Sequence, residues 1–166
     1  MLKVSFKENA KKVQVFNNNA TVVTLTGIMQ CPDFINDCLP TSVYNWINEH
    51  PSVEVSETYT TNKGFYYIII VSGKSVCAEG DTFDVQMGER IAESRAKIKL
   101  YKFMHTLCKK LMYCYHGYIY GVPEDMGTYK TATLSDYHGG LQDACRKYAE
   151  LWVKESRHLG ILLNEE

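Results

Sequence analysis

The segment from Cys77 to Ala96 gathers residue types that could do chemistry, namely carboxylates, a thiol and arginines. Its carboxylates Glu79, Asp81 and Asp84 could bind a divalent metal ion or serve in acid and base catalysis. The segment contains no histidine or lysine that would tune their pKa values. We therefore expect a structural role, in which Asp81 and Asp84 precede a helix and accept hydrogen bonds from its free backbone N–H groups.

Metal-ligating side chains recur further along the chain, at His105, Cys108, Cys114 and His116. If this stretch is helical, His105 and Cys108 share one face of the helix, whereas Cys114 lies on the other apolar stripe. The spacing also matches no common zinc finger or zinc knuckle. We expect no zinc site there.

A nucleophilic site would need a serine or cysteine close to a base. Ser135, Asp136 and His138 have suitable side chains, but the chain contains no Gly-x-Ser-x-Gly motif and no phosphate-binding loop. Ser135 or Asp136 is better explained as the N-cap of a C-terminal helix. With no catalytic set in view, we expect a protein that is not an enzyme and that needs no cofactor.

Residues 90–110 carry a local excess of positive charge on a chain whose net charge is only -1. The residues that could form a basic strip along a helix are Arg95, Lys99, Lys102, Lys109 and Lys110. Such a strip is typical of a solvated helix face. It could also track the phosphates of a nucleic acid, with nearby tyrosines stacking on the bases. Nucleic-acid binding therefore stays open as an alternative function.

Tyrosine is concentrated between residues 113 and 137, which hold half of the 12 tyrosines in the chain. They are Tyr113, Tyr115, Tyr118, Tyr120, Tyr129 and Tyr137. A tyrosine side chain is an efficient interface anchor, because it offers a large contact area with few torsions to freeze. The cluster favours binding to another protein or to a second copy of the chain as a homodimer.

The composition fits one domain outside the membrane. The chain has 166 residues, 45% of them hydrophobic, which suffices for one core and is short for two. It contains no run of eighteen apolar residues and no apolar segment after Met1, so we expect neither a membrane span nor export. Its cysteines, Cys31 and Cys38 among them, are typical of reduced thiols in the cytoplasm rather than of disulfides.

Sequence patterns predict short strands in the first half of the chain. The expected strands are residues 2–6, 12–16, 21–28, 53–59, 65–72 and 75–78. A tight turn at Gly73-Lys74 would separate the last two, because glycine supplies the positive φ of a two-residue hairpin. A short helix over 42–50 is expected after the third strand, with Thr41 as its N-cap and Pro51 at its end.

One long helix, of roughly thirty residues over 81–116, is expected because that segment has no proline and many helix formers. It has two apolar stripes, one through Phe103 and one through His105. A sheet can cover only one of them. We expect the C-terminal helix, over 135–158, or a second copy of the chain to cover the other, after a loop at 118–127.

These elements predict an α+β fold in which small antiparallel sheets pack on one long helix and a C-terminal helix packs on both. Residues 1–122 would form the domain, readable as two β-β-β-α halves at 1–52 and 53–122. Residues 123–166 would add the loop and the C-terminal helix. Within the long helix, the spacing of Gly88, Ala92 and Ala96 leaves a groove poor in side chains, which the sheet could approach closely.

The motif C-x-x-G-D-x-F-D-x-x-x-G-x-x-I-A-x-x-R-A, from Cys77 to Ala96, follows the predicted hairpin. It resembles a motif of small phage and bacterial proteins, some of them similar to double-stranded-RNA-binding-like β-β-β-α domains. The resemblance covers residues 65–98 and implies a fold rather than an activity. RNA readers of that fold grip phosphates with lysines at the start of the last helix, whereas residues 84–90 here are acidic on balance.

The sequence thus predicts a non-catalytic accessory or inhibitor protein of phage or mobile-element type, which acts by protein–protein binding. We expect it in the cytoplasm, that of the host cell if a phage encodes it. The first alternative is a nucleic-acid-binding module that uses the basic strip. The second is a metal-dependent hydrolase that uses Glu79, Asp81 and Asp84.

Overall fold

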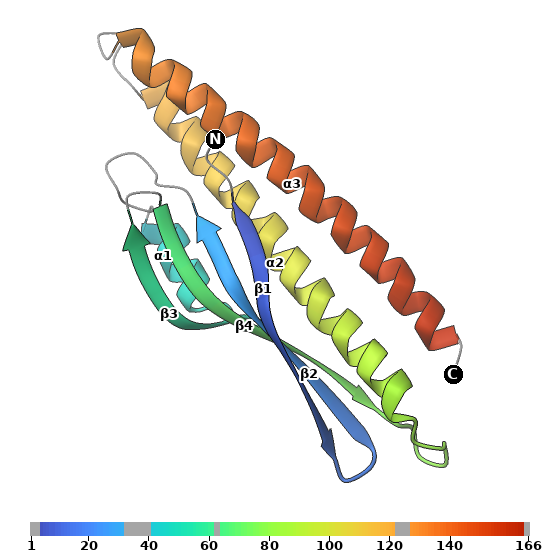
Figure 1. Ribbon diagram of the computed structural model, residues 1–166. Coiled ribbons are helices and arrows are strands. Elements are labelled where there is room, and N and C mark those ends of the chain that lie inside the picture. The colour runs from blue at the N-terminus through green and yellow to red at the C-terminus, as the bar shows by residue number, and fades with distance from the viewer. Residues whose placement is uncertain (1–3, 32–40, 62–63, 122–126, 165–166) are drawn as a thin grey trace.

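The computed structural model describes residues 4–31, 41–61, 64–121 and 127–164. Within these ranges, the side chains of residues 60–65 and 114–138 are not described. The elements are β1 (Ser5–Phe16), β2 (Ala20–Cys31), α1 (Thr41–Asn48), β3 (Glu54–Thr61), β4 (Gly64–Val76), α2 (Val85–Gly121) and α3 (Gly127–Asn164). They form one antiparallel sheet, a long helix against it and a C-terminal helix alongside (Figure 1). The expected α+β class is confirmed.

The sheet has four strands in the order β1-β2-β4-β3, and every neighbouring pair is antiparallel. Two hairpins, β1–β2 and β3–β4, join through the long pairing of β2 with β4. β2 therefore comes from the predicted half at 1–52 and β4 from the predicted half at 53–122, and both halves share one sheet.

The expected strands 2–6 and 12–16 both fall on the single strand β1, which begins at Ser5 and has a bulge between Glu8 and Ala10; residues 2 and 3 lie outside the described residues. The polar residues between them stay extended because β2 pairs with them along its length. The predicted turn at Gly73-Lys74 is wrong. β4 continues to Val76, and Gly73 pairs with Val23 in mid-strand.

The face of the sheet that meets α2, called here the inner face, carries the core. Tyr67, Ile69 and Val71 of β4 are fully buried on it, as are Val23 and Leu25 of β2. α1 lies on the same side, because its Trp46 ring stacks on Phe103 of α2 at 4.9 Å between centroids. All of these residues belong to one hydrophobic cluster or pack against it.

α2 and α3 are long, unbroken helices that lie side by side (Figure 1). At 1.5 Å per residue each is about 55 Å long. The predicted loop at 118–127 is too long, since α2 runs on to Gly121 and α3 already begins at Gly127; residues 122–126 lie outside the described residues. The predicted N-cap at Ser135 or Asp136 is wrong for the same reason. Both segments continue as helix through residues for which the sequence predicted a loop.

α3 covers the second apolar stripe of α2, which confirms the role expected for the C-terminal helix. The rings of Tyr101 and Tyr148 lie 6.5 Å apart, and those of His105 and Trp152 lie 6.1 Å apart. Tyr148 is 3% exposed and also reaches the sheet, where its hydroxyl accepts a hydrogen bond from the backbone N–H of Phe6 at 3.2 Å. In the part of the chain that the structure describes, no helix is long and apolar enough to cross a membrane.

An ion-pair cluster fixes α2 to the edge strand β1. The ammonium group of Lys11 lies 2.9 Å from Glu89 and 2.7 Å from Glu93, and Lys97 lies 2.8 Å from Glu93. Hydrogen bonds to Glu93 and Glu89 raise the pKa of Lys11 above its ordinary value. The cluster links the N-terminal half of α2 to β1.

Candidate protein-binding surface

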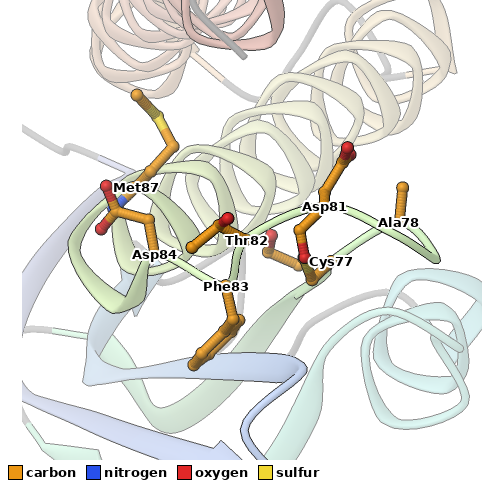
Figure 2. A pocket seen from close by; sticks show the side chains of 9 residues that line it. Cys77, Ala78, Asp81, Thr82, Phe83, Asp84 and Met87 are labelled. Atoms are coloured by element: carbon orange, nitrogen blue, oxygen red, sulfur yellow. The ribbon is translucent and has the colours of Figure 1, made fainter.

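A hollow of about 310 Å³ lies at the start of α2, in the segment where the sequence concentrates its carboxylates (Figure 2). Asp84 is the N-cap of α2: its Oδ1 accepts hydrogen bonds from the backbone N–H groups of Gln86 at 2.9 Å and Met87 at 3.1 Å. The expected capping role of Asp84 is confirmed. The Cys77 thiol donates to the carbonyl oxygen of Asp81 at 3.5 Å, which closes the turn before the helix.

The three predicted carboxylates do not converge. Asp81 and Asp84 line the hollow, but Glu79 does not. Figure 2 shows the carboxylates of Asp81 and Asp84 on opposite sides of the hollow, pointing away from each other. Among the described residues, no three His, Cys, Asp or Glu side chains are grouped so that they could hold a metal ion. The hollow is therefore explained by the way the chain turns into the capped start of α2.

Two of the four residues of the zinc hypothesis, His105 and Cys108, lie between the two long helices. His105 Nδ1 is 3.1 Å from the carbonyl oxygen of Cys145 and 3.4 Å from its Sγ. Cys108 is fully buried, and burial raises the pKa of its thiol to about 12. The side chains of Cys114 and His116 lie outside the described residues, as does Cys38. Cys31 is buried in the core.

The basic strip of α2 is partly committed to contacts within the chain. The carbonyl groups of Lys74 and Ser72 accept hydrogen bonds from Arg95 and Lys99, each at 2.7 Å. These carbonyls lie where β3 no longer pairs with β4, because the pairing with β3 ends at Ile70. The two cations therefore bind carbonyl groups at the part of the β4 edge that β3 does not cover.

The remaining lysines of the strip flank α2 on different sides. Lys102 lies 5.3 Å from the centroid of the Trp152 ring on α3, and Lys110 lies 5.4 Å from that of Trp46 on α1. Both make cation–π contacts with neighbouring helices. Lys109 is exposed. Most residues of the strip therefore hold α2 against its neighbours within the chain, in addition to carrying positive charge.

The tyrosine cluster lies at one end of the α2–α3 pair. Tyr113, Tyr115, Tyr118 and Tyr120 belong to the last turns of α2, and Tyr129 and Tyr137 belong to the first turns of α3. Tyr113 is 76% exposed. The side chains of the other five lie outside the described residues, so their predicted role stays a prediction.

A surface that the sequence patterns did not single out is the outer face, the side of the sheet opposite α2. Alternate residues of the two central strands point to it and are partly exposed. They are Val22, Thr24, Thr26 and Ile28 of β2 and Tyr66, Ile68, Ile70 and Ser72 of β4. None of the helices in the described residues packs on this face, because α1 and α2 lie on the inner side and α3 lies on α2 (Figure 1).

The middle of the outer face is uncharged and mostly apolar. Ile28 pairs with Ile68, and Thr26 pairs with Ile70. At one end, the rings of Tyr59 and Tyr66 stack at 5.2 Å between centroids, and Tyr59 is 41% exposed. The hydroxyl groups of Thr24 and Ser72 form a hydrogen bond with each other at 2.9 Å, so they need no hydrogen-bond partner outside the sheet.

A signal for this face is present in the sequence of β4. A strand with one solvated face alternates apolar and polar residues, whereas Tyr66 to Val71 is a continuous apolar run. Such a run is typical of a strand that is covered on both sides. Only the inner side is covered by the described helices of this chain.

No protein-family model, curated protein or solved structure matches the chain. The geometry of the surfaces described above is therefore the basis for assigning a function.

Proposed function

We propose that the chain is a non-catalytic accessory protein that acts by binding protein, and that the outer face of its sheet is the docking surface. The observation that carries this proposal is the uncharged apolar centre of that face, formed by Ile28, Ile68 and Ile70. Burying such side chains against a partner removes apolar surface from water, at about 25 cal/mol per Å². The stacked Tyr59 and Tyr66 would add an aromatic anchor beside them.

The long helix does not supply this surface. Its second apolar stripe, which the C-terminal helix or a second copy was expected to cover, is covered by α3 within the same chain. The tyrosine cluster at the end of the helical pair remains a second region where a partner could bind. The resemblance of residues 65–98 to phage and bacterial proteins leads us to assign the accessory or inhibitor role to phage or mobile-element biology, in the cytoplasm.

The test compares three single variants that address three surfaces. Ile70→Lys places a charge on the outer face, Tyr113→Ser removes an exposed ring near the end of α2, and Val153→Lys changes a side chain on α3 that is 48% exposed. Each is expressed with an affinity tag in the native host beside an untagged copy, and the chains that co-purify, this chain included, are quantified by mass spectrometry.

We expect Ile70→Lys to lose the chains that co-purify with the wild type, and Val153→Lys to keep them. Loss with Tyr113→Ser alone would move the docking surface to the tyrosine cluster. If Ile70→Lys keeps its fold by circular dichroism and also keeps every bound chain, the outer face is not the docking surface.

Nucleic-acid binding through the basic strip is the competing proposal. It is supported by the excess of positive charge, but Arg95 and Lys99 already bind carbonyl groups of β4. Fluorescence anisotropy with single-stranded and duplex oligonucleotides would test it. A true phosphate-binding strip would give binding at low salt that weakens steeply as salt rises and that Lys99→Glu with Lys102→Glu abolishes.

The metal-dependent hydrolase that the sequence left open is the weakest proposal, because Asp81 and Asp84 point apart (Figure 2).

A further inference from the structure

We propose that the partner of the outer face is a second copy of the chain, bound face to face about a two-fold axis parallel to the strands. This inference rests on the proposed docking function of that face. It comes from the way charge is distributed across the sheet.

The outer face changes sign from one edge to the other. Lys7 of β1 pairs with Ile28 of β2, which pairs with Ile68 of β4. On the far side of Ile68 stands Glu57 of β3. The next row begins with Ala10 and ends on Glu54 in the same way. Both rows end on a carboxylate at the β3 edge, and the first of them runs from a lysine through two isoleucines to that carboxylate.

The β1 edge is basic and the β3 edge is acidic. Lys12 pairs with Thr24, so it shares the outer face with Lys7, and both are exposed, as are Glu54 and Glu57. Neighbouring strands lie about 4.8 Å apart, which puts Lys7 roughly 14 Å from Glu57 in the same chain. The opposite charges are too far apart to pair within one copy.

A second copy can face this surface in two limiting two-fold arrangements. An axis perpendicular to the strands places each β1 edge on the other β1 edge, so that lysines meet lysines and glutamates meet glutamates. An axis parallel to the strands exchanges the edges and keeps each row at its own level, so that Lys7 of each copy faces Glu57 of the other, and Lys12 lies one row beyond Glu54. Only the second arrangement is complementary in charge, and it is self-complementary as a two-fold interface requires.

The resulting contact has the form of a β-sandwich. Two sheets that pack face to face lie about 10 Å apart with their strands within about 30° of each other. The isoleucines would fill the space between the sheets, and the charged edges would form the rim. This is the usual arrangement of a protein interface, with an apolar centre and a polar rim.

Two other surfaces fit a second copy less well. The free edge of β1 is interrupted by the bulge at Glu8–Ala10 and carries Lys11 and Lys12, features that prevent strand pairing between copies. The back of α3 has a shallow apolar hollow beside Val153, but Lys154 and Arg157 line it against the single carboxylate of Glu150. Neither surface has the complementary halves that the outer face has.

The first experiment measures the mass of the purified full chain by light scattering and sedimentation equilibrium. We expect the wild type to weigh about twice the 19.0 kDa of one chain. Ile68→Lys places a charge at the centre of the face, where we expect the dissociation constant of the dimer to rise roughly tenfold or more. Val153→Lys on the back of α3 is the matched control and should remain dimeric. Circular dichroism confirms that each variant is folded.

The second experiment tests the direction of the axis by charge reversal. One variant carries Lys7→Glu with Lys12→Glu, and the other carries Glu54→Lys with Glu57→Lys. Each alone has like charges on facing edges and should dimerise more weakly than the wild type. An equimolar mixture should form a heterodimer that regains the wild-type affinity, because acidic edges then face basic ones. With a perpendicular axis, the wild type would be as weak as either variant.

A wild-type chain that stays monomeric at 100 μM would overturn the inference while leaving the proposed function intact, since the outer face could still bind a different protein. A dimer that Val153→Lys disrupts and Ile68→Lys does not would also overturn it, and would place the interface on α3. A dimer lost in Ile68→Lys, kept in Val153→Lys and restored by the mixed charge reversals would support it.

Discussion

Gly73 of β4 lies directly against the backbone of Ala92 in α2, so closely that a methyl group built on Gly73 would stand 1.9 Å from the Ala92 carbonyl oxygen. The backbone nitrogen of Ala96 would be 2.5 Å from the same methyl group. The groove predicted from Gly88, Ala92 and Ala96 is therefore filled by the backbone of the sheet at Ala92 and Ala96, and by the Thr21 side chain at Gly88. This contact also explains why a glycine occurs in the middle of a strand.

Replacing Gly73 by alanine should destabilise the fold, because the clash is with backbone atoms that cannot rotate away. We expect a loss of about 3 kcal/mol in the free energy of unfolding, or a melting temperature lower by roughly 10 °C. Gly160→Ala in α3 is the control, since a methyl group there meets nothing within 4 Å. It should stabilise the helix by up to about 1 kcal/mol. Equal melting temperatures for Gly73→Ala and the wild type would contradict the close contact.

The N-cap at Asp84 gives a second prediction. Asp84→Ala should lower the free energy of unfolding by about 1 kcal/mol, whereas Asp84→Asn should lose much less, because asparagine also caps helices. Asp81→Ala is the control, since Asp81 contacts Ala78 and Cys77 through its backbone. Urea titrations measure all three. An equal loss from Asp81→Ala, or a melting temperature that rises with added Mg²⁺, would indicate a ligand site instead of a cap.

The Glu93 carboxyl should make stability depend on acid pH. Burial alone would raise its pKa, but hydrogen bonds from Lys11 and Lys97 outweigh burial and hold the pKa below the ordinary 4.5. A group with a lowered folded-state pKa contributes stability above its unfolded pKa and loses it as the pH falls toward the folded value. Stability should therefore decline below about pH 4.5, and Glu93→Gln should show a smaller decline.

Urea titrations at pH 7, 5 and 3 measure this difference between the wild type and Glu93→Gln. Asp143→Asn is the control, because the Asp143 side chain is 77% exposed and lies 4.0 Å from Arg146. It should follow the wild type at every pH. An acid decline of the same size in Glu93→Gln as in the wild type would show that the Lys11–Glu93 pair is not the cause.

Tyr148 gives a prediction about how α3 is fixed to the sheet. Burial raises the pKa of Tyr148 to about 12, so its hydroxyl is neutral at ordinary pH and accepts the N–H of Phe6 at 3.2 Å. Tyr148→Phe leaves that N–H without its acceptor and should cost about 1 kcal/mol. Hydrogen exchange should quicken at the amide of Phe6. Tyr113→Phe, at an exposed position, should change neither quantity.

Local patterns were sufficient for the parts of this protein that depend on neighbours in the chain. The N-cap at Asp84 follows from a carboxylate in front of a helix-forming segment. The long helix follows from the absence of proline and the two apolar stripes. The groove at Ala92 follows from the spacing of small residues along one side. Each of these features depends on residues that are close together in the sequence, so composition and periodicity predict it.

Pairing between distant segments decided the rest. Gly73 looked like a turn residue, but it lies within β4, where it pairs with Val23 of β2. The backbone of α2 packs so close to Gly73 that no side chain would fit there. Ser135 looked like a helix cap, but α3 begins eight residues earlier, at Gly127.

The outer face is the clearest case of this division. The sequence itself determined that β4 is apolar on both sides, because the run from Tyr66 to Val71 has no polar alternation. Only the tertiary structure decided that the lysines of β1 and the glutamates of β3 border the same face, because strand order and register are set by contacts between residues far apart in the chain.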